Sequence, residues 1–448
     1  MLPELKTTIP GPRSLAPAET LRRYESRNVT ALNENFPVFW ERSEGVNVWD
    51  ADGNRFLDFT SAFGVAGLGH GRAEIQQALS GQGASLMHAM GDVHPSALKG
   101  ELCERLSALT FERWGLGEGK TLLGNSGFEA VEAALKTALL ATGKPRILTF
   151  EGGYHGLGYG TLAAGGLPVF RQPFAAQLAA IGETLPFAEC EGADFRPPAE
   201  APAEALSGEV AATVALAEKA FTKGDVGAVL IEPVQGRGGK RVAHPQLLAS
   251  LRRLCEHFGA LLIYDEIFTG FNRTGALFAC DHVGIYPHII CLGKALTSGF
   301  PLSACVGRGE VMDAWPPSSG EAIHTSTFLG SPLGCAMALA SLELHADPAL
   351  AQRVRRAGST LRGLLEEIDA PAAGRLRGLG LMLGLCVEDP EIAAGLVPRA
   401  LEDGLLLLLD AHNHTLSLVP PFDITADELR WGRDRIQEYL MSLPGSIS

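Results

Sequence analysis

The feature that most constrains the fold is a repeated alternation of short apolar runs with helical patterns from about residue 71 onward. Short apolar runs bounded by turn residues are typical of parallel strands buried on both faces. Four stand out: RILTF (146–150), GAVLIEP (227–233), ALLIYDE (260–266) and HIICLGK (288–294). Helical spacing is found between them, in EAVEAALKTALLAT (129–142) and PQLLASLRRLCEHF (245–258). The alternation predicts an α/β fold in which helices cover both faces of a mostly parallel sheet.

The two ends of the chain follow other patterns. Residues 1 to about 35 look like an arm, with an amphipathic stretch at Glu19–Arg27. In VNVWDADGNRFLDFT (46–60), polar and apolar residues alternate on both sides of an Asp-Gly turn, which is typical of a hairpin. The C-terminal part has a helical stretch at 342–368 and strand candidates in RLRGLGLMLGLCV and LSLVPPFDI. We therefore expect residues 1–70 to contribute to a small α+β domain, 71–329 to form a large domain, and 330–448 to form most of the small one.

Within the expected large domain, CEGADFRPPAEAPAEALSGEVAA (190–212) breaks the alternation, because it is rich in Ala, Pro and Glu. A long stretch of this composition indicates an excursion over the surface rather than a domain boundary.

Charge and cysteine content exclude several classes of partner. The 448 residues include 37 Lys and Arg against 51 Asp and Glu, a net charge of −14, which argues against nucleic acid or an acidic membrane as partner. The apolar run Leu405 to Leu409 is far too short to cross a bilayer. The eight cysteines are scattered without a CxxC pair, so no metal site is expected. The start of the chain lacks the apolar core of a secretory signal, and we expect a cytoplasmic protein.

Candidate functional side chains follow the ends of the predicted strands. Tyr154 and His155 come after the first run, and Glu232, Asp265 and Lys294 end the next three. Ligands of open parallel sheets bind beyond the carboxyl ends of the strands, so these acids and bases should gather there. A single lysine after a strand is usually a solvated loop residue; the arrangement as a whole favours a catalytic site.

An anion site is the remaining candidate. In GNSGFEAVEAALK, Ser126 and Gly127 stand directly before an amphipathic helix, where amide groups and a hydroxyl can hold a phosphate. Ser126 and Glu129 also have the spacing of a capping box, so the serine could simply cap the helix. The sequence alone leaves both interpretations open.

Together these blocks resemble the class III aminotransferases, a subgroup of the fold-type-I enzymes that use pyridoxal 5′-phosphate (PLP). The resemblance runs from about residue 35 to the C-terminus, and its strength comes from the order and spacing of many blocks. They are FPVFWERSEGVNVWDADGNRFLDFTSAFGVAGLGH, LGNSGFEAVEAALKTA, EGGYHG, LIEPVQGRGG, LIYDEIFTGFNRTG, LGKALTSGFPLSA, HTSTFLGSPLGCAMALA and RGLGLMLG.

The resemblance implies roles for the strand-end residues. Lys294 would hold PLP as a Schiff base and then carry the proton in the transfer step. Asp265 would pair with the pyridinium nitrogen, so that the ring acts as an electron sink. Tyr154 would stack on the ring with His155 beside it, and Glu232 would order the surroundings of Asp265.

It also implies where the ends of cofactor and substrate are held. Ser126, Gly127 and the amide of Phe128 would bind the phosphate. Thr327, in HTSTF, would reach the phosphate of a neighbouring subunit, which implies a homodimer with shared sites. Arg377, in RLRGLG, would receive the α-carboxylate of the substrate, and a surface arginine at a strand start stays the alternative.

Several positions depart from the family pattern. Members that use glutamate typically read EPxQGE, where the last Glu covers the carboxylate-binding arginine; here that residue is Arg237. Leu157 stands where other members have an arginine, and Phe268 stands where they have a glutamine. The resemblance places Phe268 and the neighbouring Ile267 beside the cofactor. Phe63 approximately matches a substrate-facing tyrosine. These residues predict a substrate pocket that is apolar on one side, with Arg237 either binding a second carboxylate or lying on the surface.

The sequence therefore predicts a PLP-dependent aminotransferase that moves an amino group between an amine or amino acid and a 2-oxo acid by a ping-pong route. A racemase, epimerase or aminomutase would use the same residues and stays an alternative. A PLP-binding protein without catalysis is a second alternative, against which the combination of Lys294, Asp265 and the phosphate block argues. The amino donor and acceptor are not determined by the sequence.

Overall fold

The computed structural model describes residues 1–448 except 32–36, 199–205, 207, 411–413 and 443–448. The chain divides into two compact units, and each is described by itself. One unit combines residues 1–72 with 352–448, and the other contains residues 73–351. Segment 330–351, which the sequence analysis groups with the C-terminal part, falls in the second unit, where helix α11 (Pro332–His345) packs on α3 (Ala73–Ser85) and α4 (Ala97–Ser107).

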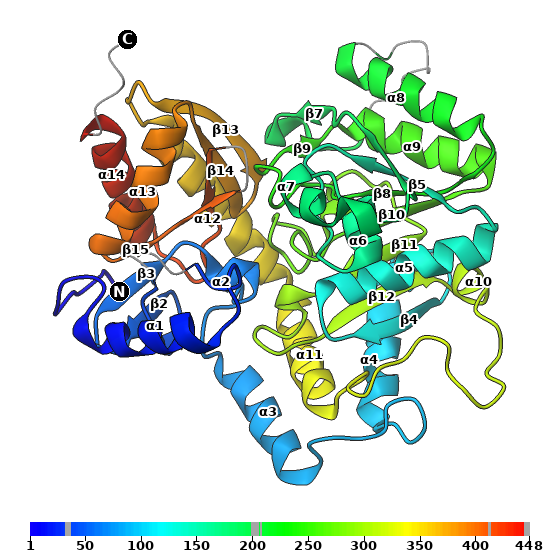
Figure 1. Ribbon diagram of the computed structural model, residues 1–448, viewed down its shortest axis with the longest axis horizontal. Coiled ribbons are helices and arrows are strands. Elements are labelled where there is room, and N and C mark those ends of the chain that lie inside the picture. Colours follow the sequence, from blue (N-terminus) through cyan, green and yellow to red (C-terminus); the bar gives the residue numbers. More distant parts are fainter. Residues whose placement is uncertain (32–36, 199–205, 207, 411–413, 443–448) are drawn as a thin grey trace. The chain divides into compact units, whose positions relative to one another are not determined.

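A seven-stranded sheet forms the centre of the second unit (Figure 1). In spatial order its strands are β4 (Gly119–Gly124), β12 (Ser303–Arg308), β11 (Ile289–Leu292), β10 (Leu261–Asp265), β8 (Val226–Ile231), β5 (Arg146–Phe150) and β6 (Gly182–Leu185). Strands β11, β10, β8, β5 and β6 pair in parallel, whereas β12 is antiparallel to both of its neighbours. Strand β4 therefore runs in the same direction as β11. The α/β fold and the mostly parallel sheet predicted from the sequence are confirmed.

Helices cover the two faces of this sheet because successive side chains of a buried strand point to opposite sides. Helix α5 (Gly127–Thr142) presents Ala130, Ala134 and Ala138 to the sheet, in one buried cluster with Leu230 and Ile263. The small alanines let the helix approach the strands closely. Helix α9 (Pro245–Phe258) lies beside β8 and β10, with α8 (Gly208–Phe221) packed against it.

The first unit contains two four-stranded sheets. One has the order β1 (Trp40–Glu44), β2 (Asn47–Asp50), β3 (Arg55–Asp58) and β15 (Leu405–Leu406), and the other β13 (Ala373–Leu379), β14 (Met382–Val387), β17 (Thr415–Leu418) and β16 (Leu408–Asp410). Besides the short α2 (Ser61–Gly64), the helices of this unit are α1 (Pro12–Tyr24), α13 (Pro390–Glu402), α14 (Ala426–Ser442) and, from residue 352 onward, α12 (Pro348–Glu366). Parallel pairing of β15 with β3 joins the N-terminal hairpin to the C-terminal part of the chain.

Most predicted elements of the large sheet match the structure closely. Strand β5 has the bounds of RILTF, and α9 has the bounds of the predicted helix at 245–258. The excursion at 190–212 lies partly outside the described residues, and its last part, from Gly208, is the start of α8. Among the helices the structure describes, none is long and apolar enough to cross a membrane.

Candidate active site

Strands with a common direction end at one edge of the large sheet and bring the candidate residues there. Asp265 is the last residue of β10, and Glu232 directly follows β8. Lys294 comes two residues after β11, and Ser126 comes two residues after β4. Tyr154 and His155 lie in the loop after β5. The contacts below join these loops into one cluster.

Lys294 lies at a sharp turn between β11 and a short 3-10 helix (Lys294–Leu296), with a left-handed φ of 45°. Its Nζ lies 4.5 Å from the centroid of the Phe268 ring. Within the described part of the chain, this nitrogen has neither a hydrogen-bond acceptor nor an ion-pair partner. Burial lowers the pKa of Lys294 to about 8, with Lys240 and Arg237 adding to the effect and Asp265 and Glu232 opposing it. An amine in this environment loses its proton far more readily than an exposed lysine does, and the unprotonated form is a nucleophile.

Asp265 is buried and both of its carboxylate oxygens are engaged. Oδ2 lies 2.8 Å from Nδ1 of His155, and Oδ1 accepts a 3.1 Å hydrogen bond from the amide of Ile267. His155 is also buried, and although burial lowers its pKa, the hydrogen bond and charge of Asp265 raise it above the ordinary value. The pair therefore holds a carboxylate in a fixed orientation at the end of β10.

Glu232 connects two loops of the cluster. Its Oε1 accepts from the amide of Tyr154 at 2.9 Å, and its Oε2 accepts from the amide of Gly236 at 2.8 Å. Burial raises the pKa of Glu232 to about 7, with His155 opposing the shift and the charge of Asp265 adding to it. The side chain thus fixes the loop that carries Tyr154 against the loop that carries Arg237.

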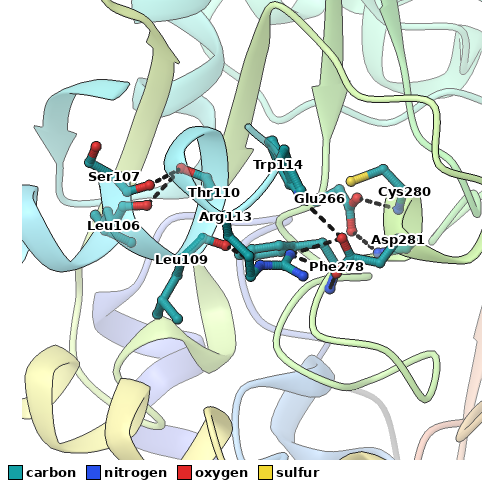
Figure 2. A network of polar contacts seen from close by, with 11 residues as sticks. Leu106, Ser107, Leu109, Thr110, Arg113, Trp114, Glu266, Phe278, Cys280 and Asp281 are labelled. Atoms are coloured by element: carbon teal, nitrogen blue, oxygen red, sulfur yellow. Dashed lines mark hydrogen bonds and ion pairs between the residues drawn. The ribbon is translucent and has the colours of Figure 1, made fainter. Parts of the chain in front are cut away.

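The residue after Asp265 anchors the end of β10. Glu266 is fully buried and accepts hydrogen bonds from the amides of Ala279 at 2.6 Å and Cys280 at 2.9 Å, and from the hydroxyl of Thr269. Figure 2 shows this carboxylate beside the segment of Cys280 and Asp281, where Asp281 pairs with Arg113 and Trp114. Because Glu266 is tied to that segment, the backbone next to Asp265 is held firmly.

The loop after β4 leaves hydrogen-bond donors unused. Glu129 accepts from the amides of Asn125 and Ser126 at 2.6 and 2.7 Å, and from the hydroxyl of Ser126 at 3.1 Å. In the described structure, the amides of Gly127 and Phe128 at the start of α5 have no recorded acceptor. Free amides at a helix N-terminus suit a phosphate group. The capping interpretation and the anion interpretation are compatible, since Glu129 leaves these two amides free.

Two side chains hold this loop in place. The hydroxyl of Ser303, at the start of β12, donates to the carbonyl of Ser126 at 2.6 Å. Ile267 packs so closely that a Cβ on Gly127 would lie 3.0 Å from its Cδ1, and one on Gly293 3.3 Å from its Cγ2. Ile267 therefore fills the space between the loop of Ser126 and Gly127 and the turn at Lys294. Free amides on one side and a buried amine without an acceptor on the other fit a phosphate-bearing aldehyde such as PLP.

Tyr154 contacts Arg237 across the opening of the loops. The Arg237 guanidinium carbon lies 5.0 Å from the centroid of the Tyr154 ring and 5.5 Å from that of Phe170. The two rings themselves meet edge to face, with centroids 5.3 Å apart. The pKa of Tyr154 is raised by burial, against the opposing charge of Arg237.

The remaining predicted residues are not joined to the cluster by any contact described. Leu157 is exposed in the loop after His155, and Thr327 is exposed in the segment before α11. Phe63 and Arg377 belong to the first unit: Phe63 is exposed with a left-handed φ of 62°, and Arg377 on β13 donates to the sulfur of Cys386. Their expected roles toward substrate stay predictions.

Sequence reasoning missed four residues that the structure adds to the site: Phe170, Lys240, Glu266 and Ser303. Lys240 is fully buried, with a φ of 56°, and its Nζ donates to the carbonyl of Gly236 and lies 5.2 Å from the centroid of Phe268. The position of Lys240 directly after the glycines of EPVQGRGG could have identified it from the sequence. No sequence pattern identifies Phe170 or Ser303, because each acts through a tertiary contact. Among the described residues, no group of His, Cys, Asp or Glu could hold a metal ion.

Comparison with known proteins gives a family match over nearly the whole chain. Residues 29–440 match the family model described as aminotransferase class-III. A 5-aminovalerate aminotransferase of Pseudomonas aeruginosa is 34% identical over 402 residues, covering 87% of this chain and 89% of that protein. A 4-aminobutyrate aminotransferase of Mycobacterium leprae is 34% identical over 454 residues, covering 98% of both.

Solved structures have the same fold. An aminotransferase from Bacillus anthracis superposes with a TM-score of 0.85 at 27% identity, covering 96% of this chain and 98% of that one. An ornithine aminotransferase from Toxoplasma gondii gives 0.81 at 28% identity, covering 98% and 96%.

Proposed function

The chain belongs to the class III aminotransferase family and is a PLP-dependent aminotransferase, and from this premise we propose that the cluster at the strand ends is its active centre, with Lys294 holding the cofactor. The enzyme moves an amino group between an amine or amino acid and a 2-oxo acid. The observation that supports the assignment is the state of the Lys294 amine. It lies against an aromatic ring, has no recorded acceptor, and its pKa is lowered to about 8.

PLP, when bound, supplies an electron sink for the carbon that loses its proton. Lys294 would hold the cofactor and, once released, take a proton from the substrate carbon and deliver it elsewhere. A pKa near 8 suits both steps, because the amine can accept and return a proton near neutral pH.

Asp265 would stabilise a protonated pyridine nitrogen through its negative charge. His155 fixes the orientation of the carboxylate, and Glu232 positions the loop of Tyr154. Ser126, Gly127 and Phe128 would hold the phosphate, and Arg377 would receive the α-carboxylate of the substrate. Ile267 and Phe268 would exclude water from the cofactor's ring.

We further propose a homodimer in which Thr327 reaches the phosphate site of the partner subunit. The exposed position of Thr327 supports this, as does the exposed apolar surface of the segments around it. Ile323 and Phe328 are 66% and 62% exposed, and Met87 is 67% exposed. Phe328 stacks at a tilt on His88, and Thr325 hydrogen-bonds Asp92, so the segments 86–93 and 323–328 lie side by side. Clustered exposed apolar residues of this kind mark interfaces.

A cytoplasmic location is also proposed, because the cysteines of the described structure are unpaired thiols, as expected in a reducing compartment.

Borohydride reduction followed by peptide mass spectrometry tests the central assignment. The expected result is one PLP adduct on the peptide that contains Lys294. An adduct on another lysine would show the assignment to be wrong. Incubation with an amine donor alone separates transfer from racemisation or aminomutation, because only transfer leaves the amino group on the cofactor and changes its absorption permanently.

A further inference from the structure

Arg237 is a half-buried cation held against two aromatic rings and forms no ion pair with the acidic side chains that the structure describes, and we propose that it binds a second carboxylate of the substrate, remote from the reacting carbon. Arg237 would then select dicarboxylic 2-oxo acids and amino acids over equally long compounds with an apolar end. This proposal rests on the proposed active centre, and its test is designed to fail separately from it.

Two aromatic rings hold the guanidinium in place. Arg237 is half-buried, and its Cζ lies 5.0 and 5.5 Å from the ring centroids of Tyr154 and Phe170. Contacts with ring faces orient a guanidinium without using its hydrogen-bond donors. The five N–H groups of Arg237 therefore stay available for a planar anion, and a carboxylate is the geometry that they match.

The carboxylates near Arg237 are engaged elsewhere. Glu232 uses one oxygen for the amide of Tyr154 and the other for the amide of Gly236. Asp265 uses its two oxygens for His155 and for the amide of Ile267. Across the described ranges, no acidic side chain forms an ion pair with Arg237. A half-buried cation without a counter-charge favours an anionic ligand.

Arg237 is also close enough to influence the reacting groups. Its charge contributes to the lowered pKa of Lys294, after burial and Lys240, and it opposes the raised pKa of Tyr154. An anion bound to Arg237 would cancel much of this influence. The same charge acts on the Lys294 nitrogen when it holds the cofactor, so occupation of the site should raise the pH at which that nitrogen loses its proton. This gives the proposal a readout independent of turnover.

The kinetic test compares two acceptors of equal length, 2-oxoglutarate and 2-oxopentanoate, with one amino donor held constant. Arg237→Gln should lower kcat/KM for 2-oxoglutarate about ten-fold or more relative to kcat/KM for 2-oxopentanoate, the effect of losing one charged contact. The effect of the lost charge on Lys294 falls on both acceptors alike and cancels in this ratio. Arg237→Lys should lie between, because it keeps the charge and loses the paired donors.

The binding test uses glutarate and pentanoate, which cannot react. Glutarate should bind to the wild-type holoenzyme and move the pH midpoint of the cofactor's visible absorption upward, whereas pentanoate should not. In Arg237→Gln the shift with glutarate should disappear. Phe170→Leu should weaken glutarate binding partially, because it removes one of the two rings that orient the guanidinium.

Arg241→Gln is the matched control. Arg241 lies in the same loop and also stacks on a ring, 4.9 Å from the centroid of Phe187, but it hydrogen-bonds the Phe187 carbonyl and lies beside Glu189. The substitution Arg241→Gln should leave the preference between the two acceptors unchanged. Equal losses for both acceptors in Arg237→Gln, or the same glutarate response in that variant as in the wild type, would overturn the proposal. Neither result affects the assignment of Lys294, which the mapped adduct tests alone.

Discussion

Replacing Lys240 by methionine should raise the pKa of Lys294, because the two ammonium groups lie near the same aromatic ring. Their Nζ atoms are 5.2 and 4.5 Å from the centroid of Phe268, so they are less than about 10 Å apart. At that separation and an effective dielectric constant of about 20, two unit charges repel by about 1.7 kcal/mol. This corresponds to a pKa rise of about one, from about 8 in the wild type toward about 9.

The fold should tolerate this change. Methionine keeps most of the buried apolar stem of Lys240 and faces the same left-handed φ as the lysine. The carbonyl of Gly236 loses its donor, at a cost of about 1 kcal/mol. The melting temperature should therefore fall by only about one or two degrees, because about 1 kcal/mol changes it by roughly one degree in a chain of this size.

The assay is the pH dependence of kcat together with a pH titration of the cofactor's absorption. Lys294 must lose its proton to act as a base, so a raised pKa moves the acid limb of the kcat profile to higher pH by about one pH unit. Arg241→Gln, which removes a cation that does not act on Lys294, should leave the limb in place. An unchanged limb in a well-folded Lys240→Met protein would refute the electrostatic argument.

Two further predictions concern the proposed active centre and assembly. Asp265→Asn should keep the fold, since a lost charged hydrogen bond costs only about 1.5–3 kcal/mol. It should slow turnover by orders of magnitude and lower the pKa of Lys294 further, because the charge of Asp265 raises that pKa. Near-normal turnover would show that Asp265 does not have its proposed role. If Thr327 completes the partner's phosphate site, sedimentation at assay concentration should show at least a dimer. PLP should stabilise this dimer by mass action, and a fully active monomer would contradict the proposal.

The large sheet was predictable because its strands carry their own signal. A strand buried on both faces must be apolar throughout, so β5, β8, β10 and β11 are visible as runs in the sequence. Strands β4 and β12 were missed, because glycine and polar residues interrupt the apolar ones in GKTLLG and SACVGR, so neither forms a continuous apolar run. Their place in the sheet depends on pairing with each other.

The candidate site also contains residues that the sequence predicts and residues that only the structure identifies. Lys294, Asp265 and Glu232 end apolar runs, so their convergence follows from the direction of the strands. The contact of Arg237 with Phe170 joins two loops that no periodicity relates, and so does the approach of the Lys240 amine to the ring of Phe268. Contacts of this kind become visible only when the loops are placed in three dimensions.

The antiparallel strand β12 has a consequence for the order in which the protein can fold during synthesis. Strand β4 is an edge strand whose neighbour in the described sheet is β12, and the hydrogen bond from Ser303 to Ser126 spans 177 residues. The ribosome therefore releases the loop of Ser126 long before the strand that holds it. Pairing over such a distance is slow, since a long loop must close first. Until β12 emerges, β4 and one edge of β11 lack the strand that lies between them, and a chaperone that shields this edge in the interval should increase the yield of enzyme able to bind its cofactor.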